Sequence, residues 1–260
     1  MNASAQQNPG YGFDSHCDRA KDLIRKTCEA PSAGVHFLVG GTQANLTIIA
    51  ACLKDYQGVI APVTSNIFNH ETGAIEATGH KILAIPTDDG KLTAAQVRKA
   101  CQDYWTETHK LFFVQPGMVY ISQTTEVGTM YSKVELAAIY DVCREYHMKL
   151  FIDGARLGYA LAAPGNDITF ADLPNLCDVF TIGGTKQGAL CGEAVIITDP
   201  GVDSEFPYYM KQRGALLAKG WVVGVQYEAL FADGLYLKLA GHAADLAVKI
   251  HHALKDMGYT

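Results

Sequence analysis

Short apolar runs bounded by turn-forming residues recur along this chain, and longer segments with helical periodicity separate them. Such alternation indicates strand–helix units and a mostly parallel sheet flanked by helices. The runs are almost continuously apolar, as expected of strands that are covered on both faces. The predicted strands are VHFLVG from Val35, GVIAP from Gly58, KILAIP from Lys81, LFFVQP from Leu111, KLFIDG from Lys149, DVFTIGG from Asp178 and EAVIIT from Glu193. The sequence therefore predicts an α/β fold.

Helix starts are predicted where a capping residue precedes an amphipathic segment. Thr93 and Ser132 each stand three residues before a Gln or Glu, which is the spacing of a capping box. The last segment, from about Gly234, is long, helical in pattern and rich in alanine. We expect a large domain over residues 1–233, followed over 234–260 by a connecting helix that begins a second, largely absent domain.

The amino-acid composition and net charge limit the kinds of molecule that this protein is expected to bind. The chain has 260 residues, 48% of them hydrophobic, which is enough to bury a substantial core. Its net charge is −6, from 21 Lys+Arg and 27 Asp+Glu without a basic block, so neither nucleic acid nor a membrane surface is an expected partner. No apolar run approaches the ~18 residues of a membrane helix. Seven cysteines without C-x-x-C spacing suggest reduced thiols, and we expect a cytoplasmic protein.

The first candidate site follows the first predicted strand, where GGTQAN over 40–45 opens a helix. In open α/β sheets, ligands gather at the carboxyl ends of the strands. Gly41 would let backbone amides approach an anion closely, Thr42 adds a hydroxyl, and the helix N-terminus adds a positive partial charge. A phosphate would fit there. The alternative is a tight strand-to-helix turn in which Thr42 is the N-cap.

The second candidate site is DGARLG, in which Asp153 leaves a predicted strand and Arg156 follows one helical turn later. A carboxylate in this place can fix a protonated ring nitrogen, and a guanidinium can grip a carboxylate with two hydrogen bonds. The alternative is a local ion pair between the two residues at a helix start.

The third candidate is Lys186 in GGTKQG, again just past a predicted strand. Burial among glycines at the sheet rim would favour the uncharged amine, which can form a Schiff base with an aldehyde. Lysine could instead bind phosphate as a point charge, but the G-x-x-x-x-G-K-[ST] spacing is missing. A phosphate cradle, an aspartate and a lysine at strand ends are together the parts needed to hold pyridoxal 5′-phosphate.

These residues lie in blocks that resemble the threonine aldolase and β-eliminating lyase family of fold-type-I pyridoxal phosphate enzymes. The matching blocks, in order over nearly the whole chain, are FLVGGTQAN, NHETGAIEATGHK, VYISQTTEVGT, FIDGARLGYAL and FTIGGTKQGAL. The resemblance implies the large domain of that fold, with Lys186 as the Schiff-base lysine and Asp153 on the pyridinium nitrogen. It also implies Gly41 and Thr42 at the phosphate, and Arg156 at the substrate carboxylate. No metal is implied.

One departure from the family pattern concerns the proton acceptor. Many family members have a histidine five residues before the glutamate of the E-x-G block, where it stacks on the cofactor ring. Here Asn66 holds that position before Glu71, and an amide is no general base. Glu126 is a candidate for the base that replaces this histidine. For His70, we favour a structural role, with its hydrogen bonds satisfied inside the protein. Thr185, next to the predicted Schiff-base lysine, is a further candidate for cofactor contact.

A second departure concerns length. Family members usually begin with a segment whose serine contacts substrate and end with a small domain that supplies an arginine. We expect both segments to be absent here, and the chain to be either a fragment or a shortened relative. Family members also build each active site between subunits, and Tyr11 and Arg213 lie in glycine-containing loops that a neighbouring site could use. We expect a homodimer or a homotetramer.

The resemblance implies a lyase that cleaves the Cα–Cβ bond of a small amino-acid substrate, threonine or allo-threonine, to give glycine and an aldehyde. Other pyridoxal phosphate chemistry, such as β-elimination or racemisation, remains open because it uses the same groups. A third hypothesis is a catalytically impaired cofactor-binding protein. A nucleotide-binding oxidoreductase is disfavoured because the G-x-G-x-x-G spacing is missing from VGGTQAN.

Overall fold

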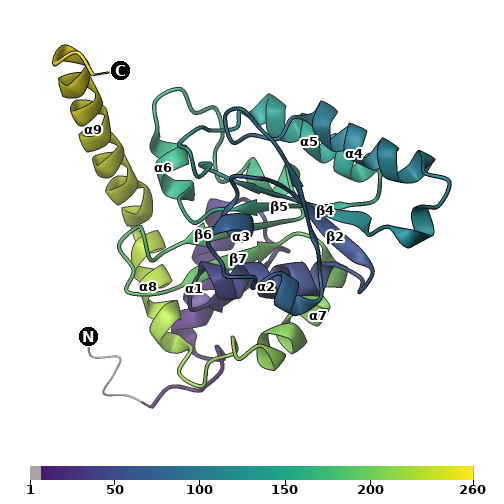
Figure 1. Ribbon diagram of the computed structural model, residues 1–260. Coiled ribbons are helices and arrows are strands. Elements are labelled where there is room, and N and C mark those ends of the chain that lie inside the picture. The colour runs from purple at the N-terminus through teal and green to yellow at the C-terminus, as the bar shows by residue number, and fades with distance from the viewer. Residues whose placement is uncertain (1–6, 260) are drawn as a thin grey trace.

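The structure is a computed structural model that describes residues 7–259, and it is built on one seven-stranded sheet (Figure 1). The strands stand in the order β1-β7-β6-β5-β4-β2-β3. Neighbouring strands are parallel except for β7, which runs antiparallel to both β1 and β6. Their bounds are β1 Gly34–Leu38, β2 Gln57–Pro62, β3 Ile82–Ile85, β4 Gln115–Ser122, β5 Lys149–Asp153, β6 Val179–Gly183 and β7 Glu193–Ile197. The predicted α/β fold with a mostly parallel sheet is confirmed.

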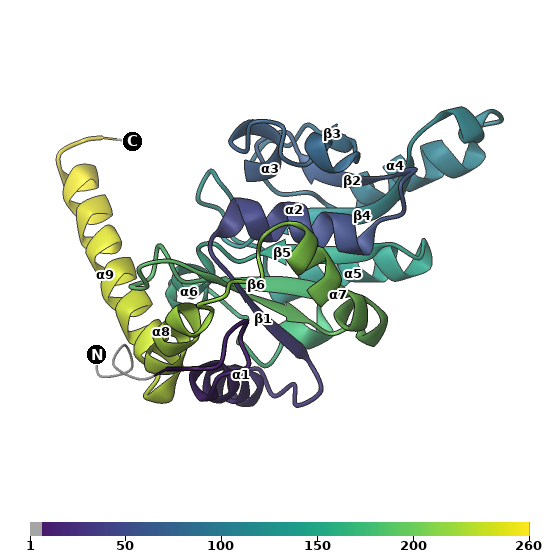
Figure 2. The same cartoon turned by 90° about the horizontal axis from the view of Figure 1, so that it is seen from below.

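Helices cover both faces of this sheet. Their bounds are α1 Ser15–Thr27, α2 Gly41–Cys52, α3 Asn66–Asn69, α4 Ala94–Thr106, α5 Lys133–Glu145, α6 Leu157–Ala162, α7 Pro200–Gln212, α8 Trp221–Ala232 and α9 Leu235–Asp256, with short 3₁₀ turns at Glu76–Thr78, Lys110–Phe112 and Leu173–Asn175. Helices α2 and α7 lie side by side on one face (Figure 2). Helices α1, α4, α5 and α8 pack on the other face.

The two hydrophobic cores explain why the strands are apolar at every position. Successive side chains of a strand point to opposite faces. In β4, Met118 and Tyr120 join the core under α2 and α7, while Val119 and Ile121 join the core under α1, α4, α5 and α8. Because both faces are covered, neither set of side chains can be polar without a partner.

One predicted strand is misplaced. Of the run from Leu111 to Pro116, only Gln115 and Pro116 belong to a strand. A 3₁₀ turn occupies Lys110–Phe112, and Leu111, Phe112 and Phe113 are all exposed. The strand β4 begins at Gln115 and continues through Pro116 and Gly117 to Ser122, beyond the end of the predicted strand. Pro116 is tolerated because it stands at the strand start, where the pairing with β2 shifts register between Gly58 and Val59.

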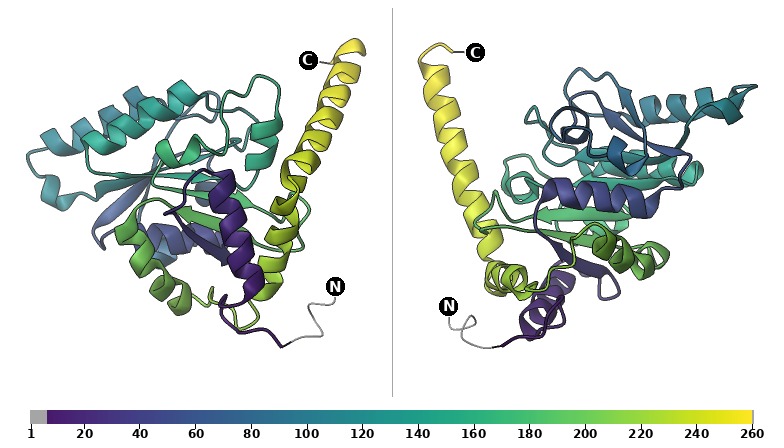
Figure 3. Two further views of the ribbon diagram at one scale, coloured as in Figure 1. Left: turned by 180° about the vertical axis from the view of Figure 1, so that it is seen from behind. Right: turned by 60° about the horizontal axis from the view of Figure 1, so that its bottom comes forward.

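The predicted helix signals are confirmed. Thr93 and Ser132 cap α4 and α5 as full capping boxes, with both reciprocal hydrogen bonds present. The final helix α9 begins after Gly234, whose left-handed φ of 65° suits glycine, and it extends away from the body of the molecule (Figure 3). The division into domains at residue 233 remains a prediction. Within residues 7–259, none of the helices combines the length and apolar character needed to cross a bilayer.

The capping box of α5 gives a prediction about stability. Replacing Ser132 by Ala removes the acceptor for the Glu135 backbone N–H, and we expect the free energy of unfolding to fall by about 1 kcal/mol. Urea denaturation would measure the change. The control is Ser15→Ala, since Ser15 is exposed at the start of α1 and its effect should stay within about 0.5 kcal/mol. Equal stability of the two variants would contradict the capping role.

Candidate active site

The parallel strands bring most of the predicted site residues to one edge of the sheet. A cavity of about 480 Å³ opens where β1, β4, β5 and β6 end. The predicted residues that line it are Gly41, Thr42, Asn66, His70, Glu126, Asp153, Arg156, Thr185 and Lys186. The carboxyl edge of the sheet therefore gathers the side chains that the sequence places after successive strands, as the topology of an open α/β sheet requires.

Tyr11 and Arg213 do not line this cavity. Tyr11 lines a separate, smaller cavity, where the ammonium of Lys211 lies 4.6 Å from its ring centre. The guanidinium of Arg213 lies 5.5 Å from the ring of Tyr209. Within one chain, these two candidates belong to a different surface from the cavity.

The start of α2 forms one wall of the cavity. The helix N-cap is Gly40, in an extended conformation, and it provides no side-chain cap. The alternative in which Thr42 is the N-cap is therefore wrong, since Thr42 lies inside the first turn. Without a capping side chain, the first backbone N–H groups and the positive end of the helix face the cavity, which suits an anion.

Asp153 forms the floor of the cavity and is held by three donors. It is the last residue of β5, and its side chain is 4% exposed. Its Oδ2 accepts hydrogen bonds from the Tyr120 hydroxyl at 2.5 Å and from Asn45 Nδ2 at 3.1 Å, and its Oδ1 accepts from the Ala155 N–H at 2.9 Å. Burial raises the pKa of Tyr120 well above its ordinary value, so this hydroxyl remains a proton donor.

A second buried carboxyl group, Glu71, is linked to the first through an amide. Asn45 Nδ2 bridges Asp153 and Glu71, lying 2.9 Å from Glu71 Oε1. The same Oε1 accepts a hydrogen bond from Asn66 Nδ2 at 2.8 Å, which orients the Asn66 amide at the cavity wall. Burial raises the pKa of Glu71, and the negative charge of Asp153 raises it further, whereas the amide hydrogen bonds oppose the rise.

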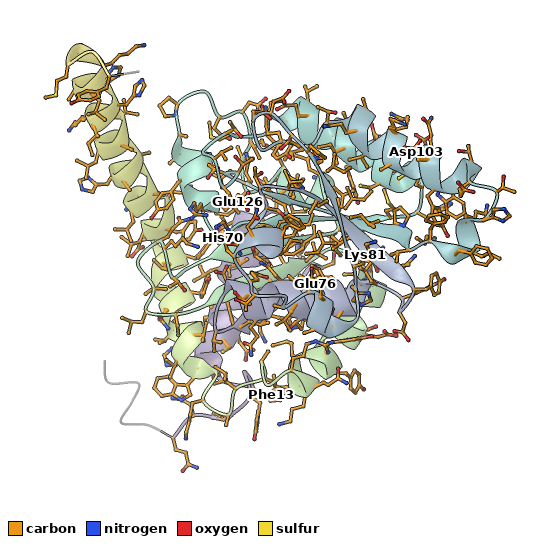
Figure 4. The ribbon with its side chains drawn as sticks, in the orientation of Figure 1. Phe13, His70, Glu76, Lys81, Asp103 and Glu126 are labelled. Atoms are coloured by element: carbon orange, nitrogen blue, oxygen red, sulfur yellow. The ribbon has the colours of Figure 1, made fainter. Side chains whose placement is uncertain are left out.

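His70 and Glu126 are the two possible bases at the cavity mouth. Figure 4 labels both side chains, which lie close together in that view, and both line the cavity. Glu126 Oε1 accepts hydrogen bonds from the Ser122 hydroxyl at 2.7 Å and from the Asn66 N–H at 2.8 Å. The His70 imidazole is exposed and has no hydrogen-bond partner among residues 7–259. The interpretation of His70 as a satisfied structural histidine is therefore wrong.

The two cationic candidates are exposed at the cavity wall. Lys186 lies three residues beyond the end of β6 in an open loop, so the expected burial among glycines is not found. Arg156 occupies the N-cap position of α6 and is also exposed. Among the ion pairs of the described residues there is none between Asp153 and Arg156, so the alternative of a local pair is wrong. Both cations are available to anionic groups in the cavity.

Glu193 is a site residue that the sequence reasoning missed. It lines the cavity, yet its side chain is only 4% exposed. Its pKa is raised to about 8, mainly by burial and further by the charge of Asp153, while the charge of Lys186 opposes the rise. Because β7 is antiparallel, its first residue lies at the edge where the other strands end. The signal in the sequence was a lone acidic residue that opens the apolar strand EAVII.

Comparison with known proteins shows which family the chain matches and which solved structures have a similar fold. The family model described as β-eliminating lyase matches residues 1–257. A low specificity L-threonine aldolase from Pseudomonas aeruginosa is 34% identical over 261 residues, which span 98% of this chain and 74% of that protein. The structure of a threonine aldolase from Leishmania major has a TM-score of 0.95 and 45% identity, covering 99% of this chain and 75% of that one. The structure of a pyridoxal phosphate-bound C-S lyase from Staphylococcus hominis, with 15% identity and a TM-score of 0.71, shares the fold.

The anchoring of Asp153 gives a prediction about stability. Replacing Tyr120 by Phe removes a buried donor to a carboxylate, and we expect the free energy of unfolding at pH 7 to fall by about 1.5–3 kcal/mol. Chemical denaturation would measure the change. Tyr208→Phe is the control, because Tyr208 is 77% exposed. If Tyr120→Phe were as stable as that control, the hydrogen bond would not hold Asp153 in place.

Proposed function

The chain belongs to the β-eliminating lyase family, and from this premise we propose that it is a pyridoxal phosphate-dependent aldehyde-lyase. It cleaves the Cα–Cβ bond of L-threonine or allo-threonine and releases glycine and acetaldehyde. Relatives named threonine aldolase, similar over almost the whole chain, support this reaction. The observation that carries the proposal is the meeting of Asp153, Arg156 and Lys186 with the start of α2 around one cavity.

The residues around the cavity fit pyridoxal 5′-phosphate. The uncapped start of α2, with Gly41 and Thr42, suits the phosphate group. Asp153 offers a buried carboxylate for a protonated ring nitrogen, and Lys186 offers an amine for the aldehyde. Asn66 has a planar amide, fixed by Glu71, that suits contact with the ring. The cofactor and these assignments are part of the proposal.

The residues of this chain hold and orient the reacting groups. When bound, the cofactor supplies a sink for the electron pair that the broken Cα–Cβ bond leaves behind. Asp153 holds a proton on the ring nitrogen, because its carboxylate is fixed by three donors and cannot turn away. Arg156 binds the substrate carboxylate and so sets the direction of the scissile bond.

A base must also take the proton of the β-hydroxyl group. As that O–H bond breaks, the oxygen forms the carbonyl of the aldehyde product and the Cα–Cβ bond is lost. Asn66 cannot accept this proton, because an amide is not basic. Glu126 and His70 line the same cavity and have atoms free to do so. Glu126 is the better positioned of the two, since Ser122 and the Asn66 N–H fix one of its oxygens.

We also propose that the protein is a cytoplasmic homodimer or homotetramer. All seven cysteines are free thiols, which suits a reducing compartment. Tyr11 and Arg213 do not line the cavity of their own chain, and we propose that they serve the cavity of a neighbouring subunit. The substrate is a small amino acid, and neither nucleic acid nor membrane is a proposed partner.

The role of Lys186 gives a direct prediction. The protein incubated with pyridoxal 5′-phosphate should gain a visible absorbance band, and borohydride should fix the cofactor to the peptide that contains Lys186. Lys186→Ala should lose both signals, because it removes the only side-chain amine that lines the cavity among residues 7–259. Lys81→Ala, at an exposed position, is the control and should keep them. A wild type that stays colourless, or an alanine variant with the same labelled peptide, would refute the assignment.

A further inference from the structure

The antiparallel strand β7 places Glu193 between two parts of the cavity wall. In the sheet register, Glu193 pairs with Leu38 on β1 and with Gly183 on β6. Leu38 immediately precedes the turn into α2, and Gly183 precedes the loop that carries Lys186. Glu193 therefore stands beside the start of α2 and beside the lysine loop at once.

The carboxyl group of Glu193 has no partner within residues 7–259 that satisfies it. Its Oε2 is buried without a hydrogen bond, and its Oε1 lies 3.6 Å from where a Cβ on Gly41 would be. Two buried tyrosines lie near Glu193, but their hydroxyls already donate hydrogen bonds to backbone carbonyls. Tyr227 donates to the Ile182 carbonyl at 2.6 Å, and Tyr236 donates to the Gly183 carbonyl at 2.9 Å. A buried polar group left unpaired is costly, which points to a ligand that completes this site.

The charges around Glu193 decide its protonation state. Asp153 faces it from β5, Lys186 from the loop after β6, and Tyr227 and Tyr236 from α8 and α9. From the β1 and α2 side, Leu38, Gly41 and the uncharged Thr42 lie beside it or line the same cavity. Burial and the negative charge of Asp153 raise its pKa and the positive charge of Lys186 lowers it, with a net pKa of about 8. At neutral pH, Glu193 is therefore mainly an uncharged acid.

We propose that Glu193 binds the phosphate of the cofactor as an uncharged acid, so that anion binding at the start of α2 is coupled to a proton on Glu193. The proposal rests on the proposed function, which supplies the phosphate monoester. The acid form can donate its O–H to a phosphate oxygen, whereas the carboxylate would repel the dianion. A Glu193 that is ionised in the free protein takes one proton from solvent when the phosphate binds, and no other bond changes.

The test is calorimetric titration with pyridoxine 5′-phosphate, which has the phosphate but no aldehyde to react with Lys186. From pH 7 to pH 9, the dissociation constant should rise about tenfold, because above the pKa each pH unit lowers the fraction of acid form tenfold. At pH 8, titrations in buffers of different ionisation enthalpy should show that the wild type takes up about half a proton more per site than Glu193→Gln. The difference between the two proteins is the measure, because the phosphate and the ring nitrogen of the probe titrate in the same way with both.

Matched variants isolate the contribution of Glu193. Glu193→Gln cannot ionise, so it should bind the probe with a much smaller pH dependence and without the extra proton uptake. Glu205→Gln, on the exposed surface of α7, should behave like the wild type. If Glu193→Gln fails to fold, the replacement test is an infrared band of a protonated carboxyl that appears at pH 9 only when the wild type binds the probe. Without such a band, the role of Glu193 is overturned.

Each outcome decides between the two proposals. Wild-type binding without proton uptake, or the same uptake in Glu193→Gln, overturns the role of Glu193. Attachment of pyridoxal 5′-phosphate to Lys186 without any binding of pyridoxine 5′-phosphate also overturns that role and leaves the proposed function standing. Failure of the protein to bind either compound overturns the proposed function and this inference together.

Discussion

The site depends on a carboxylate that is buried at the end of a central strand and kept there by fixed donors. Asp153 would be expensive to bury alone, and Tyr120, Asn45 and the Ala155 N–H supply the hydrogen bonds that offset this cost. Two of these donors come from other elements, β4 and α2. The position of Asp153 therefore fixes how α2 and the neighbouring strands meet at the cavity.

Beside the less buried Glu126, three buried carboxyl groups lie at this edge of the sheet, and their hydrogen bonds differ. Asp153 has donors on both oxygens, Glu71 is held by amides on one oxygen, and Glu193 has no partner among the described residues. Burial raises the pKa of both Glu71 and Glu193, which favours the uncharged acid of each over its carboxylate. A cation beside Asp153 and an anion beside Glu193 are then favoured together, as the two ends of one ligand.

Sequence reasoning located most of the site because parallel strands end at one edge, so residues after each strand could be expected to meet. It missed Glu193 because only the direction of β7 shows that a strand start can reach that edge. It also missed Tyr120 and Asn45, whose roles come from contacts with Asp153 that are distant in sequence. The prediction of a strand from Leu111 was wrong because an exposed apolar turn has the same local sequence pattern as a strand.

The central claim is that Asp153 is fixed in order to keep a proton on the ring nitrogen of the cofactor. Nitrogen-15 NMR of the protein loaded with ring-labelled pyridoxal 5′-phosphate would test this directly. A protonated ring nitrogen at neutral pH in the wild type, and an unprotonated one in Asp153→Asn, is the result that the account predicts. An unprotonated nitrogen in the wild type, or the same protonated signal in Asp153→Asn, would contradict it.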